Sequence, residues 1–289
     1  MLRAQGLAQQ AKKELFNNIE YKDWNIINSG NSSFSIANYS GQLAYFYTKN
    51  IKPKIIILNI DQTDFGDDYL RYRKNIKFKK NPIPHVSVEP FSFNNHRSFY
   101  NYYPYYPFDE INSEFSFKPQ SIVLLKTFFK IITNKLKYKT NKRLDFTSTL
   151  SWEEKASTLV KYNFKAVEYI KDILKKYLKT AKDIGIKEIH IFTHPHYRHI
   201  FRGNSEEESY TYNISSLVEE VIIEEKINLI DKNFKVFHKI FPISEKNCLD
   251  KTCSGHYLMN DKASHLTSEG YKKYASFINE YFLRNSKFK

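Results

Sequence analysis

The sequence predicts an α/β fold with a mainly parallel sheet, and two observations carry this prediction. Strand-like and helix-like segments alternate in the order strand, helix, strand, insertion, helix, strand, helix, strand, helix. Residues 54–60 also form a largely apolar run that is rich in β-branched side chains. Such a run is typical of a strand buried on both faces of a parallel sheet.

Local signals mark where the helices begin and end. A capping box at 151–154 opens a long helix, and Gly185 ends it. Thr267 is a good N-cap for the last helix, with Glu269 in its first turn. The expected elements are, in chain order, a strand at 24–28, a polar turn at 29–33, a helix at 36–48, a strand at 54–60, an acidic loop at 61–68, helices at 121–137 and 151–183, a strand at 187–193, a helix at 214–226, a strand at 234–237 and a helix from 268.

One segment interrupts this alternation. Residues 74–119 show no clear period and are rich in Pro, Asn, Phe and Tyr. They are too aromatic for a disordered linker, so we expect an ordered excursion that packs over the core or over a binding groove. A surface that stacks on carbohydrate is the alternative. The chain is therefore expected to be a single α/β domain, 1–289, with an aromatic-rich and helical insertion at about 74–150.

Composition limits the partners. The 289 residues are 41% hydrophobic, enough for a sizeable core, and no run approaches the roughly 20 apolar residues of a membrane span. Residues 1–13 contain no apolar segment of the kind found in a signal peptide. The net charge of +14 permits binding to nucleic acid, anionic lipid or acidic glycan. Because the lysines are scattered and no nucleic-acid-binding motif is present, we expect no specific nucleic-acid partner and no membrane span.

The two cysteines, Cys248 and Cys253, are separated by four residues. A disulfide between them would place the protein in an oxidising compartment, such as the cell envelope or periplasm, whereas two free thiols would fit the cytoplasm. The loop 194–199 contains three histidines, including His194 and His196, but their spacing fits no standard metal site. We interpret it as a substrate-facing loop, and expect no metal and no cofactor.

The most informative stretch lies near the C-terminus. Asp261 precedes His265, and His265 lies just before the last helix. A carboxylate that orients an imidazole is half of a nucleophilic hydrolase site, although both residues could also be ordinary polar loop residues. In a parallel sheet, functional loops gather at the carboxyl ends of the strands. We therefore expect the segments 29–33, 61–68, 194–199 and 261–265 to lie at one edge of the sheet.

With these four segments in place, the chain resembles the SGNH/GDSL hydrolase family from about Arg3 to Phe282. Residues 25–35 look like the family's second block, and the stretch 54–68 looks like its third block, with Thr63-Asp64 where the family has Asn-Asp. The last block of the family is Asp-x-x-His before a helix, and here Asp261 and His265 are one residue further apart.

The resemblance implies a flavodoxin-like three-layer fold and a role for each matched residue. His265 would be the general base and Asp261 its orienting carboxylate. Gly30, Ser33 and Thr63 would belong to the oxyanion hole, and Asp64 would lie in a substrate loop. The pair Cys248 and Cys253 resembles the paired cysteines of exported glycan-acyltransferase domains of this family.

The family's first block is the one that the sequence lacks. Its nucleophile is the serine of Gly-Asp-Ser, and residues 1–7 look like the residues around and after that serine, which places Leu2 at its position. Leucine cannot attack a carbonyl, so we expect a head-truncated or mis-started family member that is inactive as given.

Three functions follow from these observations. The first is an ester hydrolase or O-acyltransferase acting on an acylated glycan or small ester, active only if a serine is encoded upstream. The second is a non-catalytic relative that binds a glycan or a partner protein. The third, supported only by charge, is a basic nucleic-acid-binding protein.

Overall fold

The described part of the chain is a mixed α/β unit with a parallel three-stranded sheet. The computed structural model describes residues 27, 29–30, 34–89, 164–195, 213–225, 233–243 and 266–284, and all of them belong to one compact unit formed by Met1–Glu89 and Glu153–Lys289. The strands β1 (Ile55–Ile60), β4 (Glu188–Thr193) and β5 (Lys235–Ile240) lie in the order β1-β4-β5, and both pairs are parallel. The predicted fold class, an α/β arrangement with a mainly parallel sheet, is confirmed.

The sheet forms where the apolar runs are. Five consecutive residues of β4, from Ile189 to Thr193, are buried, as expected for the central strand of the three. The register pairs Ile57 with His190 and His190 with Phe237, which places these side chains on one face of the sheet. The predicted strands at 54–60 and 187–193 are therefore present, and β5 extends beyond the predicted 234–237.

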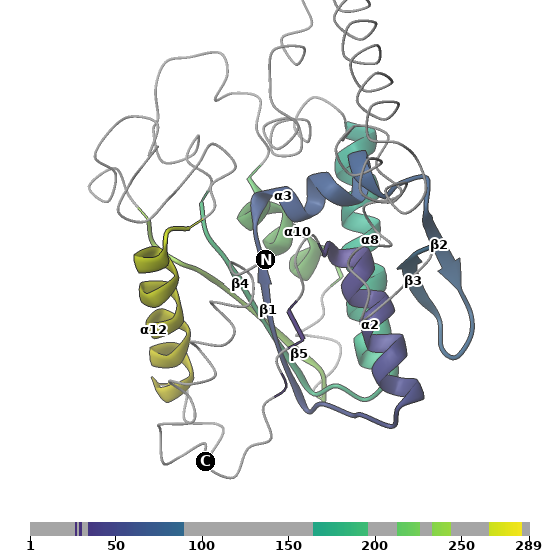
Figure 1. Cartoon of the computed structure of the whole chain (residues 1–289), viewed down its shortest axis with the longest axis horizontal. Coiled ribbons are helices and arrows are strands. Elements are labelled where there is room, and N and C mark those ends of the chain that lie inside the picture. The colour runs from purple at the N-terminus through teal and green to yellow at the C-terminus, as the bar shows by residue number, and fades with distance from the viewer. Residues whose placement is uncertain are drawn as a thin grey trace, which may run out of the picture. The chain divides into compact units, whose positions relative to one another are not determined.

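Helices cover both faces of this sheet (Figure 1). On one face α12 (Ser268–Arg284) packs its aromatic side chains against His190 and Phe192 of β4. On the other face α10 (Ile214–Glu224) is held by the contact between Ser215 and Thr193, whose side-chain oxygens are 2.8 Å apart. Helices on both faces are compatible with a three-layer α/β fold.

The helices α2 (Ile36–Thr48) and α8 (Phe164–Asp183) pack against each other next to α10. The bounds of α2 are those that the sequence predicts. After α8 the chain turns at Gly185, whose φ of 86° favours glycine, so the predicted end of the long helix is confirmed. No helix among the described residues has the length and apolarity needed to cross a bilayer.

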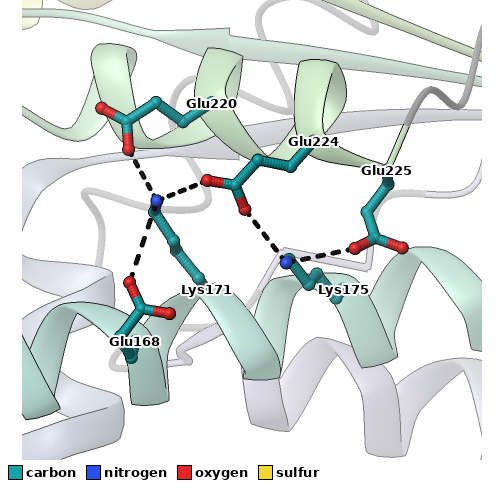
Figure 2. Close-up of polar contacts among 6 residues, drawn as sticks. All are labelled: Glu168, Lys171, Lys175, Glu220, Glu224 and Glu225. Atoms are coloured by element: carbon teal, nitrogen blue, oxygen red, sulfur yellow. Dashed lines mark hydrogen bonds and ion pairs between the residues drawn. The ribbon is translucent and has the colours of Figure 1, made fainter.

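An ion-pair network joins α8 to α10 (Figure 2). Lys171 Nζ on α8 lies 2.7 Å from a carboxylate oxygen of Glu220 and 2.8 Å from one of Glu224. Lys175 Nζ lies 3.0 Å from the other oxygen of Glu224 and 3.1 Å from Glu225. The Lys171 side chain is only 9% exposed, so this ion-pair network is partly buried.

A hairpin that the sequence did not reveal completes the described fold. The strands β2 (Ile76–Lys79) and β3 (His85–Val88) are antiparallel, and β3 packs on α2. The backbone N–H of Val86 donates to Ser40 Oγ at 3.2 Å. The hairpin lies in the region predicted to have no regular structure. Its strands do alternate polar and apolar residues, but each is only four residues long.

The sequence predicts an acidic loop at 61–68, and this prediction is wrong because the chain is helical there. After Asp61 come α3 (Gln62–Gly66) and one π-helical turn, η2 (Asp67–Arg71). Asp61 Oδ1 accepts hydrogen bonds from the N–H groups of Thr63 at 2.7 Å and Asp64 at 3.2 Å. Asp64 Oδ2 in turn accepts from the N–H of Asp61 at 3.0 Å. This reciprocal capping box satisfies the first N–H groups of the helix and explains why an acidic segment starts one.

Candidate functional site

The carboxyl ends of β1, β4 and β5 lie at one edge of the sheet because the three strands are parallel. Tyr274 of α12 connects the three strands there. Its hydroxyl donates a hydrogen bond to the side-chain oxygen of Asn59, near the end of β1. Its ring lies edge-on to His194, which follows β4, at 6.0 Å, and stacks on Phe241, which follows β5, at 4.8 Å. The first turns of α12 therefore lie at this carboxyl edge.

The residues just before α12 carry the strongest sequence prediction. Asp261 and His265 lie outside the described residues, as do Leu2, Ser33, His196, Cys248 and Cys253. The next described residues are Leu266, which is buried, and Thr267. The predicted N-cap is confirmed, since Thr267 Oγ1 accepts a hydrogen bond from the N–H of Gly270 at 3.0 Å.

The start of α2 meets the acidic segment at the same edge. Gly30, a predicted oxyanion residue, is exposed, and the carbonyl of Ser29 accepts a hydrogen bond from Gln42 Nε2 at 2.7 Å. Ser35, the N-cap of α2, has its Oγ 2.5 Å from Asp68 Oδ1. A buried contact therefore joins the start of α2, two residues after the predicted 29–33 turn, to the 61–68 segment.

Thr63 and Asp64 have different environments. The Thr63 N–H and hydroxyl both donate to Asp61 Oδ1, at 2.7 and 2.5 Å, so in this conformation its polar groups serve the helix cap rather than a ligand. Asp64 keeps part of its surface exposed. One oxygen of the Asp64 carboxyl group also belongs to the cap, since it accepts the N–H of Asp61 at 3.0 Å.

Burial changes the acid–base character of this edge. It raises the pKa of the Asp64 carboxyl well above its usual range, and the nearby Asp61 raises it further. Burial also raises the pKa of Asp68 to about 8. The pKa values of the Tyr39 and Tyr274 phenols are raised by burial and then by the neighbouring aspartates. Near neutral pH Asp68 and the two phenols favour their protonated forms, which donate hydrogen bonds.

The sequence did not single out Ser35, Tyr39, Asp68 or Tyr274 as members of this site. Tyr274 falls on the predicted core face of the last helix, at helical spacing from Tyr271 and Ile278. That spacing indicates burial but not which polar group the hydroxyl meets. The contact with Asn59 joins residues 215 positions apart, and no local pattern contains such a pairing.

His194 lies beneath the edge rather than on its surface. It is only 4% exposed, and its Nδ1 is 3.3 Å from the carbonyl oxygen of Pro195. Among the residues that the structure describes, no group of three or more His, Cys, Asp or Glu is placed to hold a metal ion. His194 therefore supports the wall of the site, next to Tyr274.

The accessible part of the edge suits a neutral, oxygen-rich ligand. Gly30 is exposed, and Tyr39, Asp61 and Asp64 are partly exposed. A phenol donates hydrogen bonds, while carboxyl oxygens accept them. Ester carbonyls and sugar hydroxyls are ligands of matching chemistry.

The chain has no match among known proteins: no protein-family model, no curated protein and no solved structure is similar to it.

Proposed function

We propose that the carboxyl edge of the sheet is an ester site of the SGNH/GDSL type, and that the protein recognises acylated glycans there. The observation that carries the proposal is the convergence at this edge of the start of α2, the acidic segment after β1 and the start of α12. These are the positions at which the resemblance expects the oxyanion turn, the third block and the acid–base pair.

Each residue has a defined role in this proposal. Asp261 would orient His265, and the turn at Gly30 and Ser33 would present N–H groups to the ester carbonyl. Asp64 would donate a hydrogen bond to the ligand from its protonated carboxyl group, in place of the amide that the family has in its third block. Its raised pKa supports this role, because a neutral acid can donate where a carboxylate cannot.

The nucleophile sets the limit of the activity. Leu2 occupies the position that the resemblance assigns to the serine, and a leucine side chain has no atom that can attack a carbonyl. Removing a triad nucleophile abolishes most of the rate but leaves binding in place. The 289-residue chain is therefore proposed to bind an acylated glycan without appreciable hydrolysis.

Calorimetric titration with an O-acetylated oligosaccharide and with its deacetylated counterpart tests the binding. We expect the acetylated form to bind at least about tenfold more tightly, a difference of about 1.4 kcal/mol. Equal affinity for the two forms, or binding of neither, would contradict an ester site.

Two substitutions of one residue test the role of Asp64. Asp64→Leu removes the donor and is expected to reduce affinity by about tenfold, the value of roughly one hydrogen bond to a buried polar group. Asp64→Asn keeps a side-chain donor and should retain affinity. Asp172→Leu, at an exposed position of α8, is the matched control.

A fluorophosphonate probe tests the proposed lack of hydrolysis. The folded chain should remain unlabelled and should release no acetate above background. Labelling that disappears in His265→Ala would instead reveal an active nucleophile and would contradict the non-catalytic assignment.

A further inference from the structure

The hydroxyl of Ser35, at the start of α2, lies between two oxygen atoms that both require a proton. Its Oγ is 2.8 Å from Asn38 Oδ1 and 2.5 Å from Asp68 Oδ1. A hydroxyl carries one proton and can donate it to only one acceptor. Ser35, Asn38 and Asp68 are all fully buried, so solvent does not relieve an oxygen–oxygen contact that lacks a proton.

The orientation of the Asn38 side chain is fixed by a second hydrogen bond. The backbone N–H of Ser35 donates to Asn38 Oδ1 at 3.1 Å. Exchanging the oxygen and nitrogen of this amide would place the NH₂ group against that N–H, with no acceptor between them. Asn38 Oδ1 is therefore an acceptor, and the Ser35 hydroxyl donates to it. The 2.5 Å contact between Ser35 and Asp68 then requires a proton from elsewhere.

We propose that Asp68 carries this proton on Oδ1 at neutral pH, and that the chain Asp68–Ser35–Asn38 is a pH-sensitive lock on the N-terminus of α2. In the locked state the Asp68 O–H donates to Ser35 Oγ, and the Ser35 O–H donates to Asn38 Oδ1. The remaining lone pairs of Asp68 accept the backbone N–H of Ala37, which lies 3.3 Å from both carboxyl oxygens. Each contact among Asp68, Ser35 and Asn38 Oδ1 then contains one proton, and among the side-chain atoms of the group Asn38 Nδ2 is buried without a hydrogen-bond partner.

Loss of the Asp68 proton opens the lock. The Ser35 hydroxyl then turns to the carboxylate, and Asn38 Oδ1 faces Ser35 Oγ without a proton between them. The N-terminus of α2 then faces the new negative charge of Asp68 and loses the ordered bond between Ser35 and Asn38. The bonds from Ser35 and Ala37 to Asp68 persist, so ionisation of Asp68 would loosen the first turn of α2 rather than separate α2 from the segment after β1.

The groups that face Asp68 disfavour its charge. Asp64 and Asp67 belong to its own segment, Tyr39 to α2 and Tyr169 to α8, and each adds negative charge when it ionises. Burial is the largest influence and raises the pKa of Asp68 to about 8, against the opposing effect of the Ser35 and Ala37 hydrogen bonds. The lock is thus expected to open at mildly alkaline pH.

Carbon-13 NMR of the side-chain carboxyl groups in aspartate-labelled protein tests the protonation directly. The resonance missing from Asp68→Asn identifies Asp68, and we expect it to titrate near pH 8. A midpoint near the ordinary aspartate value of about 4 would overturn the proposal. The resonance missing from Asp172→Asn, an exposed aspartate, provides the reference titration in the same sample.

The pH dependence of unfolding provides a second measurement, independent of any ligand. The amide of Asp68→Asn can donate to Ser35 Oγ and accept from Ala37 with no titrating proton. The unfolding equilibrium constant of the wild type, relative to that of Asp68→Asn, should rise by about tenfold per pH unit between about pH 5 and about pH 7. The ratio should level off above pH 8. A ratio that does not change with pH would overturn the lock, whatever the outcome of the ester-binding experiments.

Discussion

The Tyr274 hydroxyl of α12 donates a hydrogen bond to the side chain of Asn59 on β1, across 215 positions of sequence. The same ring packs against His194 after β4 and Phe241 after β5. One side chain therefore connects the last helix to the ends of all three parallel strands. This connection brings the start of α12 to the edge where the candidate site lies.

Substitution Tyr274→Phe tests this connection. The ring packing is retained, but the Asn59 oxygen loses its donor, so we expect a loss of about 1 kcal/mol in the free energy of unfolding. Chemical denaturation measures the change. Tyr47→Phe, at an exposed tyrosine of α2, is the control and should change stability by less than about 0.5 kcal/mol. Equal effects of the two substitutions would show that the Tyr274 hydroxyl contributes nothing.

The ion-pair network between α8 and α10 gives a second prediction. Lys171→Met removes the cation between Glu220 and Glu224, both of which are partly exposed. We expect a loss of about 1–2 kcal/mol, less than for a fully buried pair because water screens these carboxylates. Lys179→Met is the matched control on the same helix. The Lys179 side chain is 70% exposed and forms an ion pair with Asp183, one helical turn away. It should cost no more than about 0.5 kcal/mol.

The stability of the folded protein at acidic pH depends on His190. This side chain is 2% exposed, stacks on Phe237 at 4.8 Å and has its Nε2 3.0 Å from a Glu188 oxygen. Burial lowers the pKa of His190 below its ordinary value of about 6.5, although Glu188 opposes the shift. The unfolded chain therefore binds the proton more tightly, and stability falls as the pH drops below about 6.5.

Substitution His190→Phe keeps a stacked ring and removes the titration. The wild-type unfolding constant, relative to that of the variant, should increase as the pH falls from about 6.5, by at most about tenfold per pH unit. Burial also lowers the pKa of His238, so part of the acid destabilisation remains in the variant. Parallel profiles for the wild type and His190→Phe would contradict this role. Asp68 has the opposite effect on stability, which is why each residue must be compared with its own variant.

Segments with a strong local signal were predicted well. The helix at 36–48 has the predicted bounds, because its periodic apolar residues end where the polar stretch before β1 begins. The strand at 54–60 differs from β1 by one residue. Thr267 caps α12 as predicted. In these cases the residues that decide the structure are neighbours in the sequence.

The features that were missed depend on distant contacts or on burial. The acidic run 61–68 is helical because Asp61 and Asp64 cap each other, a pattern that a cluster of charges conceals. The strand His85–Val88 alternates polar and apolar residues over only four positions, and its pairing with β2 and packing on α2 are contacts between separate segments. Asp68 belongs to the site only because Ser35 and Ala37 reach it from α2. Its protonation follows from that geometry and not from any motif.

We propose that an acylated glycan binds at the carboxyl edge of the sheet. Backbone amide NMR of labelled protein, titrated with an O-acetylated oligosaccharide, locates the binding site directly. We expect shift changes at Gly30, Asp64 and Thr267, and none at Phe78 on the exposed β2 strand. Changes confined to the hairpin, or no saturable change at any of the three edge residues, would contradict the claim.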